Sequence, residues 1–396
     1  MYLSDGQLLL IVIALLYLTE CWIWVRGQSV AFVSNWGRWR IAALKSWLGN
    51  SKGGVLLINP LPPPGRVFLS HLAPISISPL GICAFNPQTV PSGVRPPGQS
   101  GRFLVFSDIT TSTTEGADLL VNGQSFAKCV TAKQARRISK LINANVIAKP
   151  ADRDRLVRAY IANQFAADEA GAVLQEATVV MRPLRWMCSV SFLFLFVLTP
   201  ILVTTFGLLR LFISLGVVLV LLTIQITILF YRAHRMLYED DTSQRVESAI
   251  KMVLCPPVAI RSPDFLTRNL LSEYSPVVVA RLLAHDGADE FVRAFIRDLR
   301  HPLKHEISDE TAADIVSWAG AEQLSHCLEY VQDTSQVLLD STQPEGDSVS
   351  YCPRCGSQFV VSSGECPDCP GVARVAFSER DQIHAQGAVS TNTEAS

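Results

Sequence analysis

Charged side chains are scarce in this 396-residue chain, at 17% of all residues against 49% for hydrophobic ones. An intrinsically disordered chain needs the opposite balance, so disorder is excluded as the main state. Soluble globular proteins usually carry about 25% charged residues, which makes an ordinary soluble enzyme a poor fit. A membrane protein with soluble parts fits this composition better.

Familiar catalytic patterns are also missing. The sequence contains no G-x-S-x-G, Walker or G-x-G-x-x-G motif. The longest apolar run, residues 187–231, contains no Asp or Glu, whereas ion-coupled transporters usually need such residues within their spans. The sequence therefore favours no particular reaction, and a transporter or channel subunit is a lesser alternative.

The amino terminus lacks the basic residues with which a secretory signal peptide begins. An apolar stretch follows from Leu8 to Val25, just long enough to cross about 30 Å of hydrocarbon. We interpret residues 1–26 as an uncleaved membrane anchor.

The long run from Met187 to Tyr231 has Arg210 as its only charged residue. One helix of this length would measure about 68 Å, roughly twice the hydrocarbon thickness. We therefore predict a transmembrane hairpin over residues 187–231 that turns near Gly207–Arg210. The alternative is a buried hairpin in a soluble core.

Lys and Arg flank the same side of all three expected spans, and cytoplasmic loops carry such an excess. This predicts a cell (inner or plasma) membrane protein with its amino terminus outside. The loop 27–186 and the carboxyl-terminal region are then cytoplasmic. The loop holds 18 basic and 8 acidic residues, whereas residues 232–396 hold 14 and 25.

Tryptophan gathers near the expected membrane edges, which indole rings prefer. Residues 27–52 are predicted to be an interfacial amphipathic segment, with a helix over 35–48 in the headgroup layer. A helix packed on the next domain is the alternative. The expected interface residues are Trp22, Trp24, Trp36, Trp39, Trp47, Trp186, Arg38 and Lys45.

The cytoplasmic loop continues with a small β domain closed by a helix, residues 53–148. Asn122-Gly123 predicts a tight type I′ hairpin, and the closing helix is expected from Thr131. A juxtamembrane helix over 149–186 should end at Pro183.

Basic residues cluster around the closing helix: Lys128, Lys133, Arg136, Arg137 and Lys140. An anionic leaflet is the simplest partner for this patch, because both ends of the loop are tethered to the membrane. A solvated face with no partner is the alternative. No nucleic acid and no small-molecule substrate is expected.

Helical periodicity predicts a cytoplasmic helical bundle over residues 232–342. Three histidines, His285, His301 and His305, lie close together in its sequence without a zinc-protease spacing. A membrane-bound enzyme with its site on this bundle is the main alternative to a non-enzymatic role.

Two C-x-x-C pairs form the most specific motif: Cys352-Pro353-Arg354-Cys355 and Cys366-Pro367-Asp368-Cys369. Each pair can form a tight turn, and together they complete a tetrahedral site of four thiolates. Residues 343–378 resemble a zinc ribbon of the rubredoxin-knuckle type, which implies a structural Zn²⁺, with iron as the alternative. Disulfides are a third interpretation, which the expected cytoplasmic placement disfavours. Residues 379–396 are expected to be a disordered tail.

The predicted fold class is a multi-pass α-helical membrane protein of three spans with a cytoplasmic β+α domain, a small helical bundle and a carboxyl-terminal zinc ribbon. The closed metal site leaves no position for a substrate. Acidic residues surround it, which disfavours phosphates. We expect a non-enzymatic adaptor or regulator whose ribbon and bundle bind a protein partner.

Overall fold

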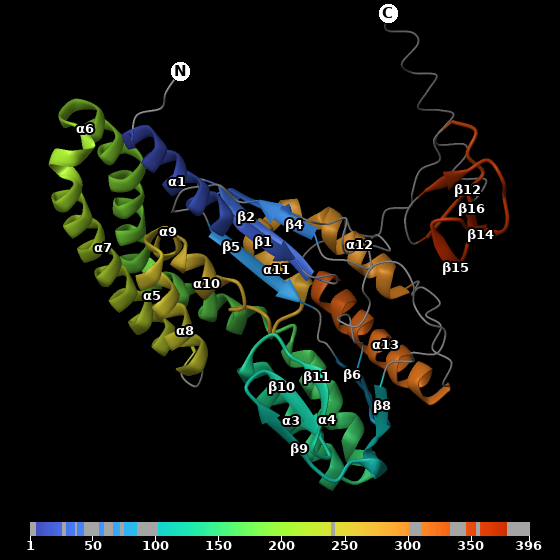
Figure 1. Ribbon diagram of the computed structural model, residues 1–396. Helices are drawn as coiled ribbons and strands as arrows, with labels where there is room; N and C mark the ends of the chain where they lie inside the picture. Colours follow the sequence, from blue (N-terminus) through green and yellow to red (C-terminus); the bar gives the residue numbers. More distant parts are fainter. Residues whose placement is uncertain are drawn as a thin grey trace, which may run out of the picture.

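The structure is a computed structural model (Figure 1). It describes residues 5–25, 29–35, 38–42, 55–58, 66–71, 75–84, 102–238, 242–300, 310–332, 346–353 and 357–377. In the view of Figure 1, antiparallel sheets and helices fill the centre and the lower part, and the long apolar helices lie on the left.

The long apolar run forms a helical hairpin. Helix α5 (Ala167–Leu193) continues through a π-helical turn, η2 (Phe194–Leu198), into α6 (Thr199–Phe206), and α7 (Leu208–Leu237) returns. Gly207 reverses the chain at φ 82° and ψ 147°, a conformation that only glycine adopts readily. Two stretches are long and apolar enough to cross a membrane, Ala167–Phe206 and Arg210–Leu237. The predicted turn position is therefore confirmed.

The hairpin exposes large apolar side chains, including Leu193, Ile201, Phe212 and Ile213 at 56–79%. Pro183 lies inside α5, so the prediction that it ends this helix is wrong. Its missing N–H removes one helical hydrogen bond. Met181 and Leu184 on either side are fully packed in a core with α7, which holds the helix together across the proline.

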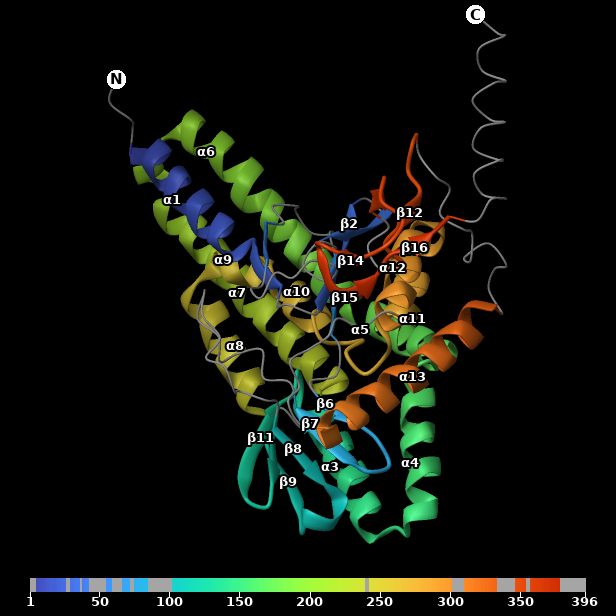
Figure 2. The ribbon, with the colours of Figure 1, turned by 90° about the vertical axis from the view of Figure 1, so that its right-hand side faces the viewer.

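Helix α1 (Asp5–Glu20) lies alongside the hairpin in both views (Figures 1 and 2). Tyr17 and Cys21 pack with Leu195 and Ile260. The predicted anchor is too long, because the chain leaves the helix after Glu20 and enters β1 (Trp22–Val25). The partner of β1 is β4 (Val55–Ile58), a pairing that local sequence does not reveal.

A three-stranded antiparallel sheet follows, in the order β3-β2-β5. Its strands are β2 (Ser29–Asn35), β3 (Arg38–Ala42) and β5 (Arg66–His71). The predicted interfacial helix over 35–48 is therefore wrong at Arg38–Ala42, which pairs residue by residue with β2. Strands β2 and β3 are separated by two residues and pair as a hairpin. The three-residue spacing of Trp36 and Trp39 is also the spacing of one helix face, which is why a helix was predicted. The remainder of that expected helix, residues 43–48, lies outside the described residues.

Strands β4 and β5 were expected in the β domain of residues 53–148, but they pair with β1 and β2 instead. The rest of that region forms two sheets of three strands, in the orders β6-β7-β8 and β11-β10-β9. The first has β6 (Ile75–Ile77), β7 (Gly81–Ala84) and β8 (Arg102–Val105), followed by η1 (Phe106–Asp108). The second has β9 (Ser112–Glu115), β10 (Asp118–Val121) and β11 (Gln124–Lys128).

Helix α3 (Ala132–Ile147) covers the second sheet and α4 (Pro150–Asn163) follows it. Thr131 caps α3, as its Oγ1 accepts a hydrogen bond of 3.1 Å from the Gln134 N–H. Asn122 and Gly123 both have positive φ, at 53° and 75°. The tight hairpin and the start of α3 are therefore confirmed.

The remaining helices form the bundle between the hairpin and the ribbon. They are α8 (Thr242–Leu254), α9 (Pro256–Ile260), α10 (Ser262–Thr267), α11 (Pro276–Ala284), η3 (His285–Ala288), α12 (Asp289–Arg300) and α13 (Glu310–Gln332). Helices α11, α12 and α13 share one core with Val30, Phe32 and Phe68 of the β3-β2-β5 sheet. The bundle and the amino-terminal strands thus fold as one unit.

Candidate metal centre

The carboxyl-terminal module contains five short strands. They are β12 (Ser350–Tyr351), β13 (Gln358–Phe359), β14 (Glu365–Cys366), β15 (Cys369–Ala373) and β16 (Val375–Ala376). Strand β12 lies between β13 and β16, and β14 pairs with β15. Among the described residues its core cluster contains only its own side chains, and Figure 1 shows the module at the right-hand edge of the molecule.

Three of the four predicted metal ligands meet in this module. The sulfurs of Cys352, Cys366 and Cys369 lie within 4.8 Å of one another, and these residues are 0–5% exposed. In a tetrahedral zinc site with Zn–S bonds of about 2.3 Å, neighbouring sulfurs are about 3.8 Å apart. The three thiols are thus spaced to bind one metal ion with little movement. Cys355 lies outside the described residues.

Backbone pairing positions these thiols. Cys366 and Cys369 are opposite each other at the turn between β14 and β15. The Cys352 N–H donates to the Ser357 carbonyl over 2.8 Å. Both contacts join residues that are close in the sequence.

Arg374 contacts both sheets of the module. Its Nε and Nη2 donate to the Glu365 carbonyl at 3.1 and 2.9 Å, and its guanidinium lies 4.3 Å from the centre of the Phe359 ring. The rings of Tyr351 and Phe377 stack with their centres 5.0 Å apart, beside the β13-β12-β16 sheet. These contacts hold the two sheets around the thiols.

Cysteines outside the module have a different environment. Burial raises the pKa of Cys83 to about 11 and that of Cys129 and Cys327 to about 12. Cys21 and Cys188 are fully buried as well. These thiols serve as apolar packing groups, and Cys83, Cys129 and Cys327 remain protonated at neutral pH.

The expected interface residues that the structure describes lie on three elements, β1, β3 and α5. Trp22 on β1 is 53% exposed and Trp186 on α5 is 71% exposed. Trp24 lies on β1, and Arg38 and Trp39 lie on β3. Trp36, Lys45 and Trp47 lie outside the described residues.

Most of the expected basic patch lies along a cleft. Lys133, Arg136, Arg137 and Lys140 line it from α3, opposite the end of α7. Lys128, at the end of β11, is exposed and does not line it. The basic residues of α3 were predicted from sequence, whereas the wall of the cleft that faces them was not.

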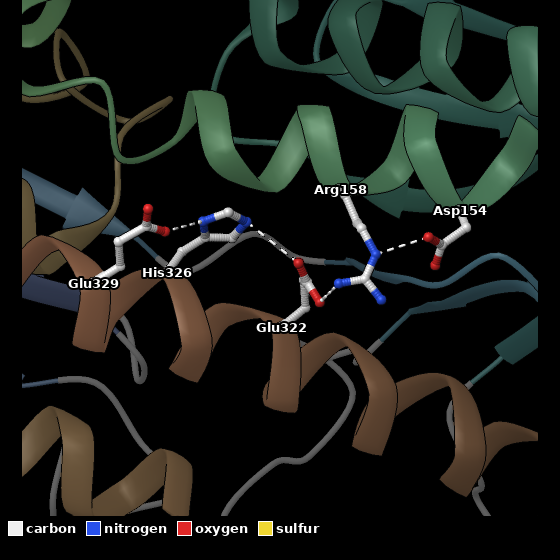
Figure 3. Close-up of polar contacts among 5 residues, drawn as sticks. All are labelled: Asp154, Arg158, Glu322, His326 and Glu329. Atoms are coloured by element: carbon white, nitrogen blue, oxygen red, sulfur yellow. Dashed lines mark hydrogen bonds and ion pairs between the residues drawn. The ribbon is translucent and has the colours of Figure 1, made fainter.

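The histidines of the enzyme alternative are not brought into a described site. His285 lies in η3 and its side chain is not described, and His301 and His305 lie outside the described residues. Figure 3 shows a different histidine, His326, in a polar chain between α4 and α13. Its ring lies 3.3 Å from Glu322 and 3.6 Å from Glu329.

That polar chain joins α4 to α13. Arg158 bonds Asp154 at 2.8 Å within α4 and also pairs with Glu322 of α13. Its guanidinium lies over the Trp318 ring at 5.3 Å. Sequence reasoning missed this contact because 164 positions separate Arg158 from Glu322.

Comparison with family models, with curated proteins and with solved structures gives no match to this chain.

Proposed function

We propose that this chain is an integral membrane protein acting as a non-enzymatic adaptor or regulator, whose metal-bound ribbon and helical bundle bind a protein partner. The buried cysteine triad is the observation that carries the proposal. Completed by Cys355, it forms a closed site of four thiolates around one Zn²⁺, which has no open position for water or substrate. Such a metal stabilises a recognition surface instead of performing chemistry.

Membrane insertion is supported by the apolar hairpin. Its exposed side chains would be costly in water, and both arms reach the length of a span. Helix α1 is the third span of the proposal. At 16 residues it rises about 24 Å, somewhat less than a typical hydrocarbon core, and it packs on the hairpin.

The proposed orientation places the tip at Gly207 and the amino terminus outside, with the sheets, bundle and ribbon in the cytoplasm. Arg210 is the charged residue nearest that tip, while Arg232 and Arg235 lie at the opposite end of α7. This distribution follows the positive-inside rule.

A protein is the favoured partner of the ribbon. Its described residues carry Asp347, Glu365 and Asp368 against Arg374, an excess of two negative charges that repels phosphates. Val360 and Val361 extend into solvent at 72% and 54% exposure. Exposed apolar side chains beside charged ones are typical of protein contact surfaces.

The test compares partner recovery from detergent-solubilised membranes of cells that make the full-length protein. Cys352→Ser with Cys355→Ser should release the metal and lose the partner. Val360→Ser should keep the metal and weaken partner recovery, because it changes only the exposed surface. Cys255→Ser, a change outside the ribbon, is the matched control and should alter neither.

Two results would contradict the proposal. The double cysteine variant keeping every partner would remove the ribbon as the recognition element. Metal-dependent turnover of a small molecule that is lost in the same variant would favour the enzyme alternative.

A further inference from the structure

A cleft of about 830 Å³ lies between α3 and the carboxyl-terminal end of α7. From α3 it is lined by Thr131, Ala132 and four basic residues, and from α7 by His234, Met236, Leu237 and Tyr238. Glu169, Phe265, Asn269 and Glu273 complete the lining. Small-molecule and headgroup sites commonly enclose about 300 to 1,000 Å³, so this cleft has the size of a binding site.

Positive charge dominates the cleft. Lys133, Arg136, Arg137 and Lys140 face two carboxylates, Glu169 and Glu273, which leaves a net charge of +2 if His234 is neutral. Glu273 takes ion pairs from Lys133 at 3.4 Å and Arg137 at 3.3 Å. The Glu273 carboxylate thus holds two of the cationic side chains in place, and the cleft keeps its net positive charge.

The first turn of α3 adds to this potential. It opens into the cleft and contains no acidic residue, so the positive end of the helix dipole is not compensated there. Lys133 is 72% exposed, and Lys140, about two helical turns further along the same face of α3, is also exposed. Both ammonium groups can reach a ligand.

The apolar side chains of the other wall come from the hairpin. About 20 residues of α7 cross the hydrocarbon, so residues 234–238 lie roughly 6 to 12 Å beyond its edge at 1.5 Å per residue. This is the depth of the lipid headgroups or of the water layer next to them. Met236, Leu237 and Phe265 therefore offer an apolar floor beside the cations.

We propose that this cleft binds a phosphate-bearing ligand, either the headgroup of an anionic phospholipid or a soluble organic phosphate. The site goes beyond the adaptor function and depends on the proposed membrane placement only for the lipid source. Phosphate oxygens accept hydrogen bonds from the lysine and arginine side chains, and the helix terminus favours the same charge.

The experiment uses full-length protein in a neutral detergent and two probes. Inositol hexakisphosphate represents a soluble phosphate, and phosphatidylglycerol offered against phosphatidylcholine represents a headgroup. Calorimetry measures the first and native mass spectrometry the second. Lys133→Gln with Lys140→Gln should weaken binding about 30-fold, from the usual contribution of each basic side chain near a surface.

The control is Lys149→Gln with Lys251→Gln, which removes two exposed lysines that do not line the cleft and should leave affinity unchanged. Glu169→Gln removes an exposed carboxylate from the cleft and should tighten binding about 5-fold. A misfolded variant would not bind more tightly, so this third change separates charge from damage.

Selective retention of phosphatidylglycerol identifies a headgroup as the ligand, and binding of inositol hexakisphosphate alone identifies a soluble phosphate. Either result supports the site if the variants follow the predicted order. The proposal is overturned if neither probe binds, or if the cleft variant and the control lose affinity equally. Failure here leaves the ribbon proposal unaffected, because the ribbon contributes no residue to the cleft.

Discussion

The buried ion pair of Arg261 and Asp264 gives the sharpest test of the fold. Their side chains are 3% and 6% exposed, and Arg261 Nη2 lies 2.5 Å from Asp264 Oδ2. The Arg261 guanidinium also lies 5.9 Å from the centre of the Tyr17 ring on α1. The pair thus sits where α1, the hairpin and the soluble unit meet.

The two partners are not equivalent. Asp264 interacts electrostatically with Arg185, Arg261 and Arg268, so one carboxylate serves three guanidinium groups. Removing one partner of a buried pair typically costs about 3 to 5 kcal/mol. We expect Asp264→Asn to cost about 4 to 5 kcal/mol, since it strands three cations. Arg261→Met should cost about 3 kcal/mol, since two cations remain beside the carboxylate.

Asp264→Asn with Arg261→Met should cost at least about 2 kcal/mol less than the sum of these two single changes, because the carboxylate and the guanidinium stabilise the fold in part through each other. The assay is equilibrium unfolding of full-length protein in mixed detergent and dodecyl sulfate micelles, followed by tryptophan fluorescence. Asp152→Asn is the matched control. It breaks the exposed pair with Arg155, which has the same three-residue spacing, and should cost at most about 0.5 kcal/mol.

Equal losses for Asp264→Asn and Asp152→Asn would refute this reasoning, as would strict additivity in the double variant. Either outcome would mean that water reaches the Asp264 carboxylate and that the junction is not closed around it.

Three further predictions follow from single features. Gly207→Ala should destabilise the hairpin by about 1 to 3 kcal/mol in the same unfolding assay, whereas Gly216→Ala, a helical position with open space for a Cβ, should stabilise it by up to about 1 kcal/mol; the reverse order would exclude the turn. After chelation, alkylation at pH 8 should label the ribbon thiols first. At that pH a thiol of pKa about 12, such as Cys129, is only about one ten-thousandth thiolate. The labelling rate of Cys129 should therefore rise about tenfold for each pH unit, and fast labelling at pH 8 would show that this thiol is not buried. Replacing Glu239-Asp240-Asp241, which follows the cleft residue Tyr238 in the sequence, by Gln-Asn-Asn should tighten binding of inositol hexakisphosphate, and unchanged affinity would show that these carboxylates lie too far away.

Local features of the fold were predictable from sequence. The turn at Gly207 followed from length, since a longer helix would overrun a bilayer. The hairpin at Asn122-Gly123 and the cap at Thr131 followed from short-range chemistry that these residues carry in any context. The C-x-x-C pairs predicted the cysteine cluster for the same reason.

Long-range pairings explain the failures. Trp22–Val25 continued an apolar run, but β1 pairs with β4 about 30 residues away and becomes a strand. Arg38–Ala42 showed helical spacing, yet pairing with β2 determines its structure. The wall of the basic cleft comes from α7, about 100 positions after α3, and the ion pair of Arg158 with Glu322 spans 164 positions. Periodicity within one segment carries no information on such partners.

The most direct test of the central claim is X-ray absorption at the zinc edge on full-length protein purified from membranes. The account predicts about one zinc per chain, surrounded by four sulfurs at about 2.3 Å, with no light-atom ligand. A zinc with three or fewer sulfurs and an oxygen or nitrogen neighbour would contradict it, because an open position would admit water and catalytic chemistry.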